Sequence, residues 1–186
     1  MQATKIKLTD LSTERLLLRK MEPRDAEDMF DYASRPEVTR FLLWREHPDL
    51  LYTRRYISYV IGRYRAGDFF DYAVVHRNSG HMIGTCGFAR LDMKNRTGEI
   101  GYVINPRYCG RGYATEAARA VIAMGFSELE LLRIEARYME NNLASARVMQ
   151  KCGMTFEGIL HSAMRIKDKQ ENIGIYAITR EDLGQS

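Results

Sequence analysis

Two glycines separated by one arginine lie in the stretch RYCGRGYATEA, residues 107–117, ahead of an alanine-rich run with helical spacing. The first amides of a helix lack intrahelical partners, and the helix dipole is positive at that end. Gly110 and Gly112 would let a ligand approach the backbone without a Cβ in the way, and Arg107 and Arg111 add positive charge. The stretch therefore predicts either a site for a phosphate or pyrophosphate group or a tight turn without a ligand.

Two common nucleotide motifs do not fit this stretch. The dinucleotide fingerprint requires a third glycine three residues after the second, where this chain has Thr115, and an acidic residue after the next strand, where Glu140 matches only loosely. The P-loop motif requires Gly-Lys-Ser/Thr, which the stretch does not contain. The spacing alone thus indicates an anion at the start of a helix without saying which one.

The composition bounds the class of protein. The chain has 186 residues, of which 45% are hydrophobic and 28% charged, so we expect one domain over residues 1–186. The net charge of +4 favours an anionic ligand, but no block of like charges occurs, so we expect no direct nucleic-acid partner. The sequence shows no apolar run of about 18 residues and no secretory signal, which predicts a cytoplasmic protein without a membrane partner. Cys86, Cys109 and Cys152 form no C-x-x-C pair, so we expect reduced thiols and no metal site.

Hydrophobic periodicity predicts a mixed order of elements. In the strand at residues 98–104, Glu99, Gly101 and Val103 should face one side of a sheet and Ile100, Tyr102 and Ile104 the other. This order predicts an α+β (mixed α/β) fold with one sheet covered by helices. We expect strands at residues 14–21, 69–76, 81–91, 98–104, 133–139, 154–166 and 171–179, and helices at residues 22–34, 50–65, 113–129 and 141–153.

The loop RYCGRGYA, residues 107–114, resembles the Gln/Arg-x-x-Gly-x-Gly/Ala signature of the GCN5-related N-acetyltransferase (GNAT) superfamily. The segments at residues 98–117 and 134–158 resemble the Rim-type subfamily, which acetylates the amino termini of ribosomal proteins, and the opening at residues 13–30 does so too. The resemblance runs from about Thr13 to Thr179. It implies the GNAT acyl-CoA N-acyltransferase fold, with a central mixed, largely antiparallel sheet flanked by helices, and acetyl-CoA as co-substrate.

The resemblance also implies which residues hold the coenzyme. The loop amides would bind the pyrophosphate, and the preceding strand would carry a bulge and pair its backbone with the pantetheine arm. Asn142 matches an asparagine that contacts coenzyme A, and it equally suits a helix N-cap. The implied coenzyme-binding residues are Val103, Ile104, Asn105, Arg107, Tyr108, Cys109, Gly110, Arg111, Gly112, Tyr113, Ala114, Thr115 and Asn142.

Direct attack by an amine requires a base, because the amine must be neutral. An α-amino group with a pKa near ~8 is partly neutral at pH 7, whereas a lysine side chain with a pKa of ~10.4 is neutral to a far smaller extent. A carboxylate can take the proton directly or through a water. Glu99 is favoured because it matches a glutamate common in the subfamily, although it could instead pair with Arg96 or Arg137; Glu135, in the middle of the next strand, is the rival base.

The leaving thiolate and the carbonyl oxygen need donors. A strand amide around Val103 could donate to the oxygen. Ser145 matches the family residue placed near the thioester sulfur, although it could also be an ordinary first-turn serine facing solvent. Many relatives carry a tyrosine four residues later as general acid, and Met149 cannot replace it, which leaves Ser145 or water. Cys109 has no histidine partner that would make it an acyl-carrying nucleophile.

The acceptor side is less defined by the sequence. Trp44, Tyr52 and Tyr56 could wall an acceptor groove or simply pack on the core, and the arginines around them hint at an acceptor with negative charge. The leading hypothesis is acetylation of the α-amino group of a ribosomal or other protein N-terminus. The alternatives are a small amine such as a polyamine or an antibiotic, or a non-catalytic acyl-CoA-binding protein, which Met149 and Met164 keep open. A homodimer is also left open.

Overall fold

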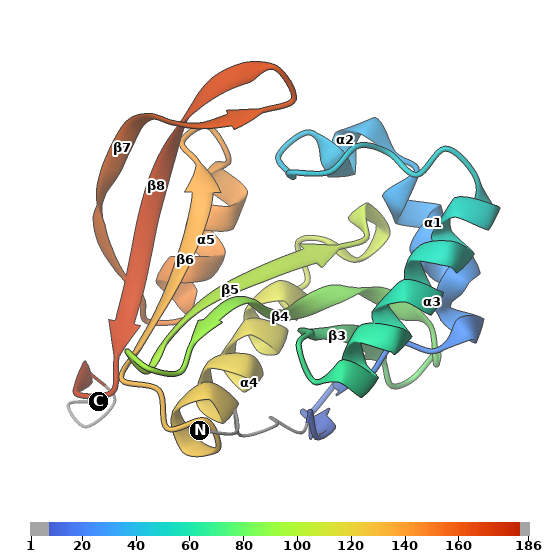
Figure 1. Ribbon diagram of the computed structural model, residues 1–186, viewed down its shortest axis with the longest axis horizontal. Helices are drawn as coiled ribbons and strands as arrows, with labels where there is room; N and C mark the ends of the chain where they lie inside the picture. The colour runs from blue at the N-terminus through green and yellow to red at the C-terminus, as the bar shows by residue number, and fades with distance from the viewer. Residues whose placement is uncertain (1–7, 183–186) are drawn as a thin grey trace.

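The computed structural model describes residues 8–182, which form one eight-stranded sheet with helices on both faces (Figure 1). The spatial order is β1-β2-β3-β4-β5-β6-β8-β7, and every neighbouring pair is antiparallel except β5–β6. The strands are β1 (Leu11–Ser12), β2 (Leu16–Arg19), β3 (Phe70–His76), β4 (Met82–Asp92), β5 (Thr97–Ile104), β6 (Arg133–Met139), β7 (Thr155–Ile166) and β8 (Lys169–Thr179). The helices are η1 (Pro23–Asp25), α1 (Ala26–Ala33), α2 (Pro36–Thr39), α3 (Leu50–Ala66), η2 (Pro106–Tyr108), α4 (Tyr113–Ser127) and α5 (Leu143–Lys151).

Every expected strand and helix is present, and the mixed fold is confirmed. The helix expected at residues 22–34 is divided into the 3-10 turn η1 and α1, while β1 and α2 were not expected. The helix ends follow local chemistry. The Asp49 side chain accepts a hydrogen bond from the Tyr52 amide at the start of α3, and Gly67 ends that helix in the left-handed conformation. No helix in the described residues has the length and apolar character needed to cross a membrane.

The two faces of the sheet are covered by different helices. Ile100, together with part of Tyr102 and Ile104, packs on the side of α4 and α5, where Ala117, Val121 and Met149 are buried. Val103 packs on the opposite side with residues of α1 and α3. The predicted alternation of β5 is therefore confirmed, and the Glu99–Gly101–Val103 side of this strand faces α1 and α3.

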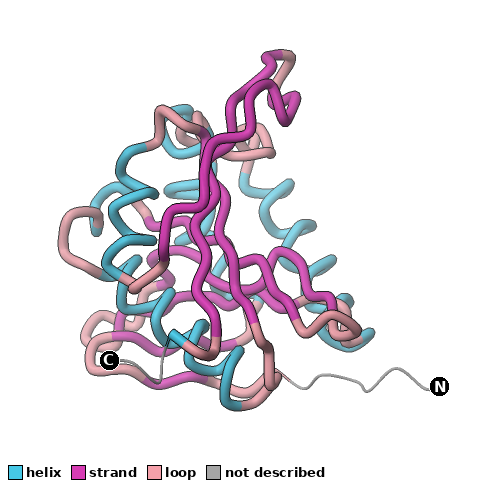
Figure 2. Tube along the Cα trace, turned by 90° about the vertical axis from the view of Figure 1, so that its left-hand side faces the viewer, coloured by secondary structure: helices cyan, strands magenta, loops and turns pink. Residues whose placement is uncertain are grey.

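The sheet opens between β5 and β6. These parallel strands pair only from Thr97–Arg133 to Ile100–Ala136, and beyond that point β5 stays with β4 while β6 continues with β8 (Figure 1). The separation leaves the end of β5 without a strand partner on its β6 side. The distal end of the β7–β8 pair projects beyond the helices (Figure 2).

The bulge expected in the strand before the loop lies in the neighbouring strand. The register of β4 against β5 shifts between Phe88 and Arg90, so Ala89 is the extra residue, and β5 pairs residue by residue from Ile100 to Ile104. A bulge bends its strand and increases the local twist. The bulge in β4 lies opposite the point at which β5 departs from β6, so it is still associated with the opening of the sheet.

Candidate active site

A cavity of about 860 Å³ occupies the opening between β5 and β6 and extends over the α1/α3 face of the sheet. It brings together several residues that the sequence singled out from separate segments. Those lining it are Glu99, Val103, Arg137, Asn142, Ser145, Met149 and Met164, together with Tyr102 and Gly101. Glu135 and the loop at residues 105–115 are outside this lining.

The glycine loop has the backbone that an anion site requires. Gly110 and Gly112 have φ values of 77° and 84°, a left-handed conformation that favours glycine. Gly112 is the N-cap of α4, and within the described residues no side chain caps this helix. The first-turn amides of α4 therefore remain available to an external acceptor, as the anion-site interpretation requires.

Asp31 of α1 holds one side of this loop. Its carboxylate accepts a hydrogen bond from the Asn105 side-chain amide at 2.8 Å and lies 3.3 Å from the Arg107 guanidinium. Although burial opposes the shift, hydrogen bonds from Asn105 and Arg35 hold the pKa of Asp31 below its usual value. The Asn105 amide donates to the Ile83 carbonyl and its carbonyl accepts from Tyr108, so both backbone groups of Asn105 already have partners in the chain.

Glu116 holds the other side of the loop through the turn between β1 and β2. It accepts hydrogen bonds from the Thr13 hydroxyl at 2.6 Å and from the Arg15 amide at 2.9 Å, and it pairs with the Arg15 guanidinium at 2.6 Å. Arg15 also donates to the Arg111 carbonyl and lies over the Tyr113 ring. Sequence reasoning missed this clamp because its partners lie about a hundred residues apart and form no motif.

The two candidate bases are neighbours but have different surroundings. Glu99 and Glu135 are register partners of the parallel pair. Glu135 is held by Arg137 at 2.9 Å and by Arg133 at 3.3 Å, whereas Glu99 forms, within residues 8–182, one ion pair, with Arg137 at 3.5 Å. Burial raises the pKa of Glu99, and Arg137 opposes that shift. The pairing of Glu99 with Arg137 is confirmed, and because Glu99 also lines the cavity it stays a candidate base; Arg96 pairs with Glu130 instead.

A pair of hydroxyl groups faces the cavity from the other side. The Tyr102 hydroxyl lies 2.9 Å from the Ser145 Oγ and also donates to the Ser145 carbonyl at 2.9 Å. Asn142 is the N-cap of α5, and its side chain accepts from the Ser145 amide at 3.3 Å. Burial raises the pKa of Tyr102, so this hydroxyl stays protonated. Sequence reasoning placed Tyr102 only on one face of its strand and missed its link to Ser145.

The acceptor side of the cavity is aromatic. Trp44 and Tyr56 line it, but Tyr52 does not; Tyr52 is half exposed and packs edge-on against His47. The structure therefore does not support the groove interpretation of Tyr52, whose side chain packs against His47 instead of lining the cavity. Asp71 of β3 also lines the cavity, and the sequence analysis did not single it out.

The arginines near these aromatic residues do not form an anion site. Arg45 pairs with Asp168, Arg54 with Glu27, and Arg63 with Asp68. Arg55, the fourth arginine of this segment, is exposed and outside the cavity lining, so the hint of a negatively charged acceptor is not supported.

Cysteine and metal chemistry find no support in the described part of the chain. Desolvation raises the pKa of the Cys109 thiol, which disfavours the reactive thiolate. Within residues 8–182, no three His, Cys, Asp or Glu side chains group as metal ligands would.

Comparison with known proteins agrees with this geometry. Residues 15–155 match the family model described as "Acetyltransferase (GNAT) domain". The chain is 31% identical over 172 residues to the uncharacterized N-acetyltransferase p20 of Bacillus licheniformis, covering 92% of this chain and 97% of p20. It is 30% identical over 96 residues to a ribosomal-protein-serine acetyltransferase of Escherichia coli, covering 52% of this chain and 54% of that protein.

Its structure resembles that of a GNAT-family acetyltransferase from Bacillus anthracis, with a TM-score of 0.84 at 31% identity, covering 93% of this chain and 99% of that one. Enzymes of this family take the acetyl group from acetyl-CoA. The opened sheet, the uncapped glycine loop and these similarities together show that the chain belongs to the GNAT family of acetyl-CoA-dependent N-acetyltransferases.

Proposed function

We propose that this enzyme acetylates the α-amino group of a protein N-terminus, with ribosomal proteins as the acceptor class. The observation that carries the proposal is the position of Glu99, which lines the cavity where the sheet opens and whose ion pair with Arg137 is 3.5 Å long. An α-amino group near pKa ~8 needs only a weak base to become neutral, unlike a lysine near ~10.4. The similarity to a ribosomal-protein-serine acetyltransferase supports the same acceptor class.

The residues of this chain fit acetyl-CoA, which supplies an acetyl thioester when bound. The uncapped first turn of α4 suits the pyrophosphate, and the end of β5, unpaired on its β6 side, leaves strand backbone for the pantetheine arm. The assignment of individual coenzyme contacts at residues 103–105, 107–115 and 142 is part of this proposal.

In the proposed mechanism, Glu99 accepts the proton of the acceptor ammonium group. The burial that raises its pKa makes it a better proton acceptor, and Arg137 opposes that shift and so favours the ionised carboxylate. A backbone amide near Val103 donates to the carbonyl oxygen that gains negative charge. Glu135 lies outside the cavity lining, is held by Arg133 and Arg137, and in this mechanism takes no part in the reaction.

Ser145 donates the proton to the departing sulfur. Met149, where many relatives have a tyrosine, is buried and has no proton to give. The hydroxyl of Tyr102 lies within hydrogen-bond distance of the Ser145 Oγ and orients it, while its raised pKa keeps its own proton in place. Ser145 regains its proton from solvent, and Glu99 releases to solvent the proton that it took from the acceptor.

Thiol release measured with pairs of peptides tests the proposal. We expect release with peptides that have a free α-amino group and none with the same peptides formylated at that group. Glu99→Gln should lower kcat by about 100-fold or more, as loss of a general base does, while coenzyme binding is unchanged. Glu135→Gln is the matched control and should retain activity. Turnover confined to polyamines or antibiotics, or equal activity of Glu99→Gln and the parent, would contradict the proposal.

A further inference from the structure

Asp71 is a carboxylate in the acceptor half of the cavity that has no basic partner. Within residues 8–182, each of the other acidic residues that line the cavity forms an ion pair: Glu99 pairs with Arg137 and Asp68 with Arg63. Within the same residues, Asp71 forms no ion pair. A charge removed from water without a partner is costly, so an unpaired carboxylate in a binding cavity calls for an explanation.

The surroundings of Asp71 increase that cost. Tyrosines face it from the helices packed on this side of the sheet, Tyr32 from α1 and Tyr56 and Tyr64 from α3, and Thr85 lies on the neighbouring strand. Within residues 8–182, the Tyr32 hydroxyl is buried without a hydrogen-bond partner, so it does not compensate the charge. Burial raises the pKa of Asp71 to about 7, although hydrogen bonds from the Thr85 side chain and the Tyr72 amide favour the charged form.

A row of glycines connects Asp71 to the catalytic end of the cavity. Asp71 is the register partner of Gly87, which in turn is the partner of Gly101 on β5. A Cβ at Gly87 would collide with the backbone of Phe70, and a Cβ at Gly101 would enter open space. The two glycines thus contribute no side chain of their own between Asp71 and Glu99, and all four residues line the same cavity.

The geometry of the sheet sets the length of this row. Cross-strand partners point to the same face, so Asp71 lies on the same side as Glu99 and Val103. Neighbouring strands are about 4.8 Å apart, which places Asp71 roughly 10 Å from Gly101 across the floor. An acceptor whose reacting amine lies at Glu99 can extend a second group along the glycines to Asp71.

We propose that Asp71 binds a second, positively charged group of the acceptor, about two strand spacings from the amine that is acetylated. This inference rests on the proposed function for the position of the reacting amine. The acceptor that this site would bind is a primary amine that carries a second ammonium or guanidinium group. A peptide with a basic side chain next to its N-terminus has this chemistry, and so does a diamine. Tyr56 and Trp44 add aromatic faces that favour a cation over a neutral group.

A peptide pair tests the inference in turnover. The two peptides differ only at their second residue, lysine in one and norleucine in the other, and mass spectrometry confirms acetylation at the α-amino group. We expect kcat/KM to favour the lysine peptide by about 10- to 100-fold, the range for a hydrogen bond to a charged group. Asp71→Asn should abolish this preference, and Asp10→Asn, which removes an exposed carboxylate outside the cavity, should keep it. Equal rates for the two peptides in the parent enzyme would overturn the inference without any variant.

The pH dependence of the preference for the lysine peptide is a measurement that would not change if Asp71 had only a structural role. The preference for the lysine peptide should grow as the pH rises through about 7, where Asp71 ionises, and should be flat in Asp71→Asn. A preference that is independent of pH in the parent enzyme, or that persists in Asp71→Asn with an unchanged thermal unfolding midpoint, would contradict a role for this carboxylate.

Binding of small amines separates this inference from the proposed function. Calorimetry on the enzyme with coenzyme A compares 1,5-pentanediamine with n-pentylamine. Tighter binding of the diamine by about tenfold, lost in Asp71→Asn, supports the cation site even if no peptide is acetylated, in which case only the protein-N-terminus proposal falls. Equal binding of the two amines overturns the cation site. If the lysine and norleucine peptides are then acetylated at equal rates, the cation site is refuted while the proposed function still holds.

Discussion

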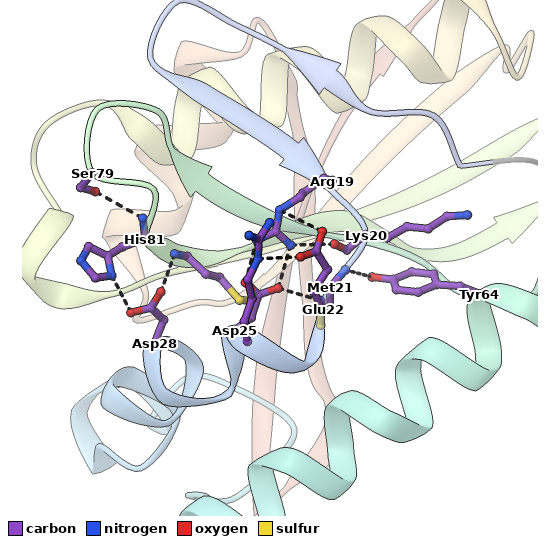
Figure 3. A network of polar contacts seen from close by, with 11 residues as sticks. Arg19, Lys20, Met21, Glu22, Asp25, Asp28, Tyr64, Ser79 and His81 are labelled. Carbon is purple, nitrogen blue, oxygen red and sulfur yellow. Dashed lines mark hydrogen bonds and ion pairs between the residues drawn. The ribbon is translucent and has the colours of Figure 1, made fainter.

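Replacing Asp25 with asparagine should destabilise the protein strongly, because it would leave Arg19 as a buried charge without its carboxylate. The two side chains are only 8% and 3% exposed, and they are joined by hydrogen bonds of 2.8 and 2.7 Å (Figure 3). Asp25 also accepts from the Glu22 amide at 2.7 Å, which closes the turn that leads into α1. Removing one partner of a buried pair costs about 3–5 kcal/mol.

That cost converts to a large change in thermal stability. For a domain of this size, 1 kcal/mol corresponds to a shift of about 2–4 °C, so Asp25→Asn should lower the Tm by roughly 6–20 °C. Thermal and urea unfolding followed by circular dichroism measure the change. Arg24→Met is the matched control, because Arg24 pairs with Glu22 at the surface, where a pair is worth less than about 1 kcal/mol.

A double variant checks the cause. Adding Arg19→Met to Asp25→Asn removes the charge that the single variant leaves unpaired, while the asparagine oxygen can still accept from the Glu22 amide, so it should recover most of the loss. The reasoning is refuted if Asp25→Asn is no more destabilising than Arg24→Met, or if the double variant is as unstable as the single one.

Three further predictions concern the loop and the cavity floor. Gly101→Ala should lower kcat/KM for the acceptor by about tenfold with an unchanged Kd for coenzyme A, because the new methyl enters the open floor; equal kinetics would show that acceptors do not cross it. Gly112→Ala should lower the free energy of unfolding by about 1–2 kcal/mol, because the φ of Gly112 is 84°. Gly62→Ala is the control and should raise it by about 0.5–1 kcal/mol, because Gly62 lies inside α3 and an added Cβ there meets open space. Similar effects of the two substitutions would contradict the conformational argument. Glu116→Gln should raise the Kd for coenzyme A about tenfold by loosening the loop. Desolvation would raise the pKa of Glu116, but hydrogen bonds from Thr13 and Arg15 outweigh it and hold the pKa below its usual value. The affinity for coenzyme A should therefore be constant above about pH 5 and fall only as the pH drops below the ordinary value of ~4.3, where Glu116 becomes protonated. Calorimetry that shows no fall in affinity at acidic pH would argue against the clamp.

The fold was predictable where the signals are local. Gly67 marks the end of α3, Asn142 the start of α5, and alternation alone assigns the two faces of β5. The two-residue β1 and the four-residue α2 are too short to show a periodic pattern. The division of the first helix depends on contacts with Arg19 in the preceding strand, which a helical pattern cannot reveal.

The site was predictable only in its contiguous parts. The glycine loop and Glu99 lie in a continuous stretch whose resemblance to the family could be read directly. Tyr102 and Ser145 are 43 residues apart, and their contact exists only because β5 and α5 meet at the opening of the sheet. Asp71 reads in the sequence as an ordinary polar residue of a strand, and it becomes notable only through its register with Gly87.

The acceptor nitrogen is the point on which the whole account depends. The most direct measurement is mass spectrometry of a peptide that offers both a free α-amino group and an internal lysine, after incubation with acetyl-CoA and the enzyme. The account predicts acetylation at the α-amino nitrogen, with Glu99→Gln at least about 100-fold slower. Acetylation of the lysine side chain alone, or α-amino acetylation at the same rate in Glu99→Gln, would contradict it.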